Sequence, residues 1–150
     1  MSEKIAIGSD HRGFKLKKNL IEFLHEQGVT VEDVGAFSED AADYPEFARA
    51  VASKIACREC DRGILICGSG IGMSITANKF PGVRAALCHD EQSAKMSRLH
   101  NDANVLVLSE SVDTDRARRI LAVWRSTSFE GGRHNRRLEL IRAIERENFK

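Results

Sequence analysis

Long apolar runs and an excess of either charge are both missing from this sequence. Its uninterrupted apolar stretches reach about five residues, far short of the ~20 that a membrane-spanning helix needs. The 23 Lys and Arg residues are balanced by 22 Asp and Glu residues, for a formal net charge of +1. We therefore expect no binding to nucleic acid or to a membrane. The opening MSEKIAIGS lacks the apolar core of a signal peptide, so the sequence predicts a cytoplasmic protein.

Cysteine is also scarce, and its spacing argues against two kinds of site. A disulfide framework is not expected in a reducing compartment. Cys57 and Cys60 form a C-x-x-C pair, but Cys67 and Cys88 do not form the second close pair of a zinc ribbon. A redox C-x-x-C normally opens a helix after a strand, whereas this pair closes a helical pattern in polar surroundings. We interpret the pair as structural, with a thiol-redox protein as an alternative.

Only two prolines interrupt the chain, and its apolar residues follow strand and helix patterns in turn. A length of 150 residues with 42% hydrophobic content is typical of one domain, here residues 1–150. The predicted strands are 4–8, 30–34, 63–67, 83–87 and 104–108. The predicted helices are 14–24, 45–55, 71–79, 91–98 and 113–126.

Strands that alternate with helices favour a parallel sheet covered on both faces. The pattern therefore predicts a three-layer α/β/α sandwich, Rossmann-like, whose five parallel strands lie in the flavodoxin-like order 2-1-3-4-5. After Phe129 the segment EGGRHNRRLELIRAIERENFK predicts one more amphipathic helix, with no strand after it. Because an added terminal helix often packs on a second subunit, we expect a homodimer.

Ligands of open parallel sheets bind outside the carboxyl ends of the strands, where the strand order reverses. In the expected order this point lies between the first and third strands. The first strand ends in GSDH, which supplies Asp10 and His11, and the third ends in CGSG, which supplies Cys67. The sequence thus predicts an Asp-His pair that faces a cysteine and a glycine-rich turn across one crevice.

The glycine-rich turn does not match either common nucleotide motif. A dinucleotide fingerprint needs glycine at position 73, where this chain has methionine, and a Walker A loop needs a Gly-Lys-Ser/Thr ending. Backbone N–H groups in such a turn can stabilise a negative oxygen of a phosphate or an enolate. A strand-to-helix turn without a ligand is the alternative. Cys67 lies at the carboxyl end of the third strand, directly before this turn and the helix that follows, and is suited to act as a thiolate nucleophile, base or metal ligand.

Two further groups of polar residues lie later in the chain. His100 occurs in SRLHNDAN, just before the fifth strand, and we expect it on or near the carboxyl side of the sheet. Arg133 and Arg137 are four residues apart, so they share one helix face and suit a phosphate. A nucleic-acid patch would carry more positive charge and exposed aromatic residues.

Several segments together resemble one enzyme family: GSDHRGFKLK, DYPEFA, GILICGSGIGMSITANKFPGVRAALC, SRLHNDANVL and FEGGRHNRRLELI. They are similar, in order and spacing over nearly the whole chain, to the ribose-5-phosphate isomerase B family, which includes galactose-6-phosphate isomerase subunits. The resemblance implies a homodimer or tetramer that uses no metal or nucleotide cofactor. It also implies aldose–ketose isomerisation of ribose 5-phosphate to ribulose 5-phosphate through a cis-enediolate.

The resemblance also implies a role for each candidate residue. Cys67 would be the base that moves a proton between C1 and C2, and His100 would assist ring opening, with Asp10 near the ring and hydroxyl oxygens. The active site would be built across a dimer interface. The turn that would supply backbone donors to the enediolate, with Ser69 counted as catalytic, consists of Gly68, Ser69, Gly70, Ile71 and Gly72. The other implied substrate ligands are Asn101 for sugar hydroxyls and His11, Arg133 and Arg137 for the phosphate.

The chain departs from the family pattern at two positions. Ser69 stands where threonine is frequent, which keeps the hydroxyl. Ser111 stands where a phosphate-contacting arginine is usual, although Arg116 or Arg118 could substitute. The second departure leaves open another sugar phosphate, a tetrose or hexose phosphate, or a rare free aldose. A sugar-phosphate-binding module without catalysis is the alternative from another class.

Overall fold

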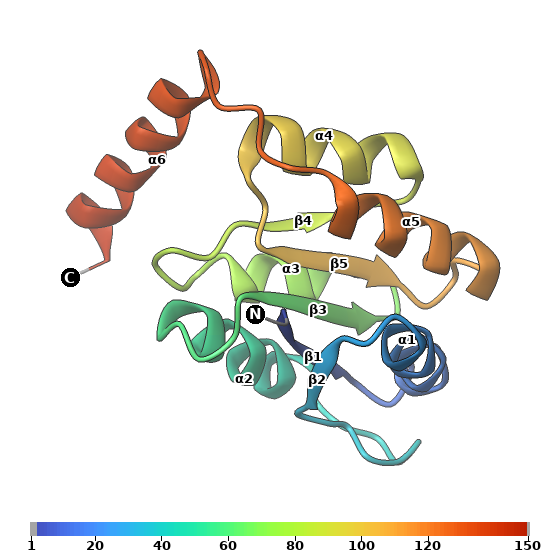
Figure 1. The fold of residues 1–150 in the computed structure, drawn as a ribbon. Helices are drawn as coiled ribbons and strands as arrows, with labels where there is room; N and C mark the ends of the chain where they lie inside the picture. The colour runs from blue at the N-terminus through green and yellow to red at the C-terminus, as the bar shows by residue number, and fades with distance from the viewer. Residues whose placement is uncertain (1–2, 150) are drawn as a thin grey trace.

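A five-stranded parallel sheet runs through the centre of the computed structural model, which describes residues 3–149 (Figure 1). The predicted alternation of strands and helices is confirmed. The strands are β1 (Lys4–Ser9), β2 (Thr30–Asp33), β3 (Arg62–Cys67), β4 (Ala85–Leu87) and β5 (Val105–Ser109). The helices are α1 (Phe14–Glu26), α2 (Tyr44–Ala56), α3 (Ile71–Ala77), α4 (Glu91–Asn101), α5 (Thr114–Ser126) and α6 (His134–Asn148).

The strand order is β2-β1-β3-β5-β4, so the predicted flavodoxin-like order is wrong for the last two strands. The physical reason lies in their side chains. All five residues of β5 are buried, and β5 pairs with β3 on one side and β4 on the other. The three residues of β4 are only half-buried. The more apolar strand therefore takes the inner position, and the short strand forms the edge.

This order places α4 on the opposite face from the one that a flavodoxin-like order would use. Side chains of β3 alternate, so that Ile64 and Ile66 pack with α1, α4 and α5, whereas Leu65 and Cys67 pack with α2 and α3. The chain runs back from β4 to β5, and a right-handed connection then puts α4 next to α5, on the face that also carries α1. The sheet consequently has a second reversal point, between β3 and β5, in addition to the expected one between β1 and β3.

The ends of the helices follow local sequence signals. Gly28 follows α1 with φ of +75°, as expected for a glycine that ends a helix. Pro45 lies in the first turn of α2, where a missing N–H costs nothing. Asp90 and Asp113 cap α4 and α5, each accepting a backbone N–H three residues ahead.

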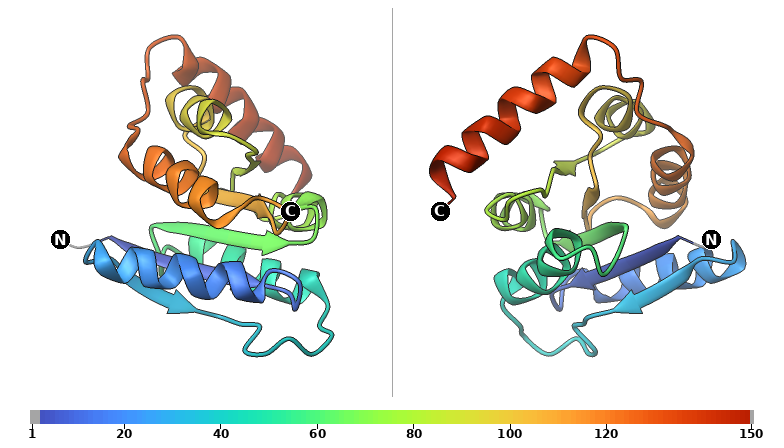
Figure 2. Two further views of the ribbon diagram at one scale, coloured as in Figure 1. Left: turned by 90° about the vertical axis from the view of Figure 1, so that its right-hand side faces the viewer. Right: turned by 60° about the vertical axis from the view of Figure 1, so that its left-hand side comes forward.

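The predicted C-terminal helix, α6, stands apart from the two helical layers (Figure 2). A groove of about 560 Å³ separates it from the edge strand β4. The helix exposes three large apolar side chains, Leu140, Ile141 and Ile144, of which Ile141 and Ile144 line this groove. None of the helices formed by residues 3–149 is long and apolar enough to span a membrane.

Candidate active site

Asp10 follows β1 directly and lies against the end of β3. Its backbone N–H donates to the carbonyl oxygen of Ile66 at 3.3 Å. Its carboxylate Oδ1 accepts the backbone N–H groups of Arg12 at 3.0 Å and Gly13 at 3.1 Å. Asp10 is buried, so these bonds hold the carboxylate in one position. The structure thus places Asp10 next to the residue that precedes Cys67, as the sequence predicted.

His11 connects the same turn to the loop before α2. Its Nδ1 lies 3.1 Å from the backbone nitrogen of Ala42 and 3.3 Å from the carbonyl oxygen of Ala42. Nδ1 therefore has a partner in either tautomer, as an acceptor from the N–H or as a donor to the carbonyl. This arrangement orients the ring and leaves Nε2 for another partner.

Cys67 is the last residue of β3 and is only 4% exposed. Its register partner on β5 is Ser109, and its carbonyl oxygen accepts the backbone N–H of Glu110 at 2.9 Å. The glycine-rich turn begins at the next residue, and α3 begins at Ile71. Gly70 has φ of +82°, a conformation that favours glycine. The buried thiol is therefore held between the sheet and a tight glycine-rich turn.

Tyr44, at the start of α2, is a site residue that the sequence reasoning missed. A Cβ atom added to Gly72 would lie 2.4 Å from the ring of Tyr44, so the tyrosine packs directly on the glycine-rich turn. The phenol is partly exposed at the edge of the crevice. A sequence signal existed, because a glycine inside a short helix indicates that another group approaches closely. The identity of that group could not be read from the sequence.

A second crevice opens at the new reversal point, between the carboxyl ends of β3 and β5. It encloses about 470 Å³ and is lined by residues that include Arg12, Gly68, Ser69, Ser109 and Ser111. The Oγ atoms of Ser109 and Ser111 lie 2.7 Å apart. Arg12 is the second residue that the sequence reasoning missed, because its neighbour across the crevice depends on the strand order.

His100 does not lie at this edge of the sheet, so its predicted position is wrong. It occupies the last turn of α4, a helix that runs back from the end of β4 to the start of β5. Asn104, which follows this helix, accepts the N–H of Gly63 at the amino end of β3. Cys67 ends the same strand, at the opposite edge. At ~3.3 Å per residue, the five residues of β5 separate the two edges by about 13 Å.

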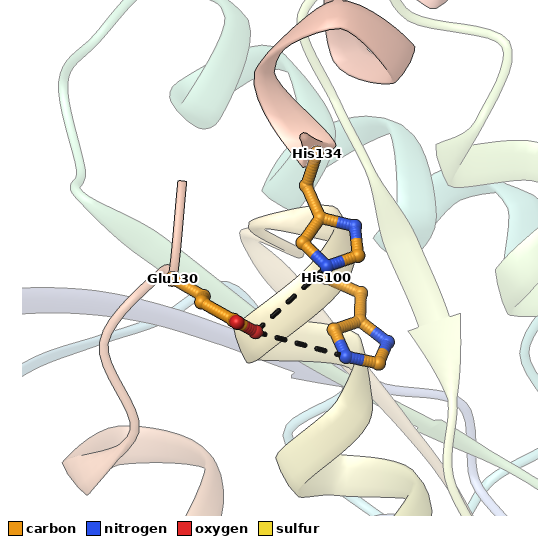
Figure 3. Close-up of side chains that lie close together, drawn as sticks. All are labelled: His100, Glu130 and His134. Atoms are coloured by element: carbon orange, nitrogen blue, oxygen red, sulfur yellow. Dashed lines mark ion pairs between the residues drawn. The ribbon is translucent and has the colours of Figure 1, made fainter. Parts of the chain in front are cut away.

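His100 instead forms a cluster with Glu130 and His134 (Figure 3). The two imidazole rings are stacked, and one carboxylate oxygen of Glu130 lies 3.9 Å from Nε2 of His100 and 3.8 Å from Nε2 of His134. Burial lowers the pKa of His134 below its ordinary value, and the neighbouring His100 adds to this effect. His134 is therefore neutral near pH 7.

The same three residues are those that could hold a metal ion. Their candidate ligand atoms lie within 4.8 Å of one another. Ligand atoms around a tetrahedral zinc ion are about 3.3 Å apart, given bonds of ~2.0–2.1 Å. The histidine nitrogens of this cluster lie 3.8 and 3.9 Å from the carboxylate, so each of these two separations would have to shorten by about half an ångström.

The remaining predicted ligands lie close to this cluster rather than to Cys67. Asn101 ends α4, and Arg133 immediately precedes α6. Arg133 and Arg137 are exposed and take part in none of the ion pairs formed within residues 3–149. The structure therefore divides the predicted site into two groups. One contains Asp10, His11, Cys67 and the turn Gly68–Gly72, and the other contains His100, Asn101, Arg133 and Arg137.

The profile of the Ribose/Galactose Isomerase family matches residues 5–141. The chain belongs to this family. It is 49% identical over 144 residues to the ribose-5-phosphate isomerase B of Escherichia coli strain K12, a match that covers 95% of this chain and 97% of that protein. The resemblance found in the sequence is confirmed.

Solved structures of this isomerase family share the fold. The ribose-5-phosphate isomerase B of Clostridium thermocellum is 48% identical, with a TM-score of 0.94 over 96% of this chain and 98% of that one. The enzyme of Mycoplasma genitalium, solved with bound ribulose-5-phosphate, is 42% identical, with a TM-score of 0.94 over 99% of both chains. The predicted α/β class with a five-stranded parallel sheet is confirmed, apart from the order of β4 and β5.

Proposed function

We propose that this chain is an aldose–ketose isomerase that interconverts ribose 5-phosphate and ribulose 5-phosphate through a cis-enediolate. One observation carries the proposal. In a member of the Ribose/Galactose Isomerase family, Cys67 ends β3 directly before a glycine-rich turn, and Asp10 lies beside the same strand end. Isomerisation requires a base near the carbon that loses its proton and hydrogen-bond donors near the developing oxyanion. Cys67 can supply the base, and the backbone N–H groups of the turn can supply the donors.

In the proposed reaction Cys67 acts as a thiolate. It takes the proton from C2 of the open-chain aldose, and the electron pair of the broken C–H bond moves to the carbonyl oxygen O1. Backbone N–H groups of the turn Gly68–Gly72, together with Ser69, stabilise the enediolate. The proton of O2 passes to O1, and the Cys67 thiol returns its proton to C1. The carbonyl is then at C2, and the thiolate is regenerated for the next cycle.

The proposal includes a homodimer in which each site draws on both subunits. His100 lies about 13 Å from the edge that holds Cys67, so one subunit cannot supply both groups to one sugar. Large apolar side chains are exposed on α3, at Ile71 and Ile75, and on α6. Their burial against a second copy would stabilise a dimer. Such dimers could also pair into a tetramer.

In this arrangement the partner subunit's His100 would assist ring opening. The neutral His134 ring and the Glu130 carboxylate restrict how the His100 ring can turn. Asn101 would bind sugar hydroxyls, and Arg133 and Arg137 would bind the phosphate from the same subunit as His100. His11 would approach the phosphate from the subunit that carries Cys67.

A second candidate keeps this chemistry and changes the sugar. Residue 111 is a serine, so it contributes no positive charge to the crevice, and its hydroxyl lies 2.7 Å from that of Ser109. A tetrose or hexose phosphate, or a rare free aldose, remains the alternative substrate. A role in pentose phosphate metabolism and a cytoplasmic location stay predictions.

The test uses ribose 5-phosphate in D2O, followed by NMR for deuterium at C1 of ribulose 5-phosphate and, after the reverse reaction, at C2 of ribose 5-phosphate. We expect turnover by the wild type and none by a folded Cys67→Ala variant. The matched control is Cys57→Ala, which removes an exposed thiol that follows α2 and precedes the amino end of β3, at the opposite edge of the sheet from Cys67. Equal activity of Cys67→Ala and wild type would exclude the cysteine base. A wild type that is feeble on ribose 5-phosphate but active on another sugar phosphate would favour the second candidate.

A further inference from the structure

The crevice between β3 and β5 contains a positively charged side chain, Arg12, that has no role in the proposed reaction. Of the residues that line its 470 Å³, Arg12 and His89 are the ones that can carry positive charge. Arg12 belongs to the β1–α1 turn, two residues after Asp10. The crevice therefore combines a guanidinium with the hydroxyls of Ser69 and Ser111, beside the strand end that carries Cys67.

The guanidinium of Arg12 is held over this crevice by two features. Its Nη2 donates to Oε1 of Glu110 at 2.9 Å. Its other atoms lie on Gly68, where an added Cβ would be 2.7 Å from Nη1 and 2.9 Å from Cζ. A side chain at position 68 would thus occupy the place of the guanidinium. Gly68 therefore leaves room for the guanidinium of Arg12, and Glu110 holds it there by a hydrogen bond.

The pairing with Glu110 leaves Arg12 available to an anion. The two side chains are 60% and 34% exposed, and ion pairs in such surroundings are weak. One N–H of the five on the guanidinium is used by the carboxylate. A phosphate dianion offers more charge and accepts two parallel N–H bonds from one guanidinium. It can therefore displace Glu110 without moving the arginine far.

The arginines at the start of α5 do not compete for this place. Nε of Arg118 donates to Asn19 at 2.7 Å, and its guanidinium lies over the ring of Phe23, on the side of α1. Nε of Arg119 lies 3.5 Å from the carboxylate of Glu91. Arg116 is not among the residues that line the crevice.

We propose that Arg12 binds the phosphate group of the sugar-phosphate substrate in this crevice, and that Glu110 holds its guanidinium there between turnovers. This inference rests on the proposed function and deepens it. The positive charge that residue 111 lacks would come from the opposite wall of the crevice, from the turn that also carries Asp10 and His11. Specificity for a phosphorylated sugar would then not require a cation at Ser111.

The experiment compares wild type, Arg12→Ala, Arg12→Lys and the control Arg118→Ala. It measures KM and kcat for ribose 5-phosphate, and the inhibition constant of inorganic phosphate. Loss of a charge-assisted hydrogen bond predicts that Arg12→Ala raises both KM and the inhibition constant by about 10- to 100-fold. Arg12→Lys should recover part of this loss, because it keeps the charge without the bidentate geometry. Arg118→Ala should match the wild type.

A second variant tests the location of the charge. Ser111 shares the crevice with Arg12, so Ser111→Arg in the Arg12→Ala background places a guanidinium in the same cavity. We expect this double variant to recover phosphate inhibition and KM to within about tenfold of the wild type. The recovery also shows that the loss in Arg12→Ala was not a loss of fold.

The outcomes separate this inference from the proposed function. If the wild type turns over ribose 5-phosphate and Arg12→Ala changes KM and the phosphate inhibition constant by less than twofold, the role of Arg12 is refuted. If the wild type does not turn over ribose 5-phosphate, direct binding of inorganic phosphate by calorimetry decides. Binding that depends on Arg12 would keep the anion site and reject ribose 5-phosphate as the substrate, whereas binding that does not would reject both.

Discussion

The imidazole ring of His100 stacks on that of His134, with ring centroids 4.3 Å apart and an interplanar angle of 19°. Both rings direct a nitrogen towards Glu130, but the carboxylate lies beyond hydrogen-bond distance of each. Nε2 of His134 is buried and has no hydrogen-bond partner among the described residues. A second proton on His134 would therefore be opposed by its burial and by its neighbours.

This relationship predicts how stability depends on pH. Burial, the nearby His100 and the arginines at 133 and 137 lower the pKa of His134 below 6.5, against the opposing Glu130 carboxylate. As the pH falls through 6.5, the unfolded chain binds a proton that the folded chain does not, so stability decreases. His134→Gln should reduce this decrease. Urea unfolding at pH 7.5 and 5.5 measures it, with the exposed His25→Gln as control; an unchanged decrease in His134→Gln would contradict the prediction.

The glycine-rich turn predicts different costs for two alanine substitutions. Gly70 and Gly82 have nearly equal φ values, +82° and +81°, but a Cβ at Gly70 would lie 2.5 Å from Leu87, whereas nothing lies within 4 Å of one at Gly82. Gly82→Ala should cost about 1 kcal/mol for the backbone conformation alone. Gly70→Ala should cost about 3 kcal/mol, because the steric conflict is added. Denaturant unfolding measures the difference, and equal costs would show that Leu87 moves aside freely.

A buried lysine gives a separate stability prediction. Lys17 is fully buried, and its Nζ donates to Asp33 at 2.7 Å and to the carbonyl oxygen of Ala36. Asp33→Ala should cost about 3 kcal/mol, because it leaves a buried charge without its partner. Lys17→Met combined with Asp33→Ala should recover most of this loss. The matched control is Lys15→Met, an exposed lysine of the same helix, which should change stability by less than about 0.5 kcal/mol.

The four thiols should differ in their reactivity. Burial and the Glu32 carboxylate raise the pKa of Cys60 to about 11, so about one in a thousand of these thiols is ionised at pH 8. Burial also raises the pKa of Cys88. Iodoacetamide at pH 8, followed by mass spectrometry, should modify the exposed Cys57 and spare Cys60 and Cys88. Equal modification of Cys57 and Cys60 would revive the thiol-redox alternative for this pair.

The alternation of elements could be predicted because each strand and helix carries its own periodicity. The order of β4 and β5 could not be predicted from adjacency in the chain, but the composition held a usable signal. The segment VLVLS of β5 is wholly buried, whereas the three residues of β4 are not. An apolar strand with two buried faces belongs inside a sheet, and a short strand with partly exposed residues belongs at the edge.

Only part of the candidate site could be predicted from the sequence. Asp10 follows β1 and Cys67 ends the neighbouring parallel strand β3, so the topology rule predicted their proximity. His100 was misplaced because α4 continues to Asn101, which carries the histidine on the helix to the amino edge of the sheet. The partners of Tyr44 and Arg12 lie across the two crevices, and these contacts depend on the assembled sheet rather than on any motif.

The proposed two-subunit site predicts complementation between two inactive variants. Cys67→Ala and His100→Ala homodimers should each be inactive or nearly so. In a mixed dimer one site would combine both substitutions, and the other would combine an intact Cys67 with an intact His100. A 1:1 mixture, unfolded and refolded together, forms mixed dimers in half of the population, each with one intact site. We therefore expect about a quarter of the wild-type activity.

The control for this experiment measures the activity of a mixture whose mixed dimers contain no intact site. A chain that carries both substitutions is refolded with an equal amount of wild type. Its mixed dimers have no intact site, because each site lacks either Cys67 or His100. Activity should then come only from the wild-type homodimers, again about a quarter. If the two single variants regain nothing while native mass spectrometry detects their mixed dimers, each subunit must contain a complete site, and the division of the site between subunits would be wrong.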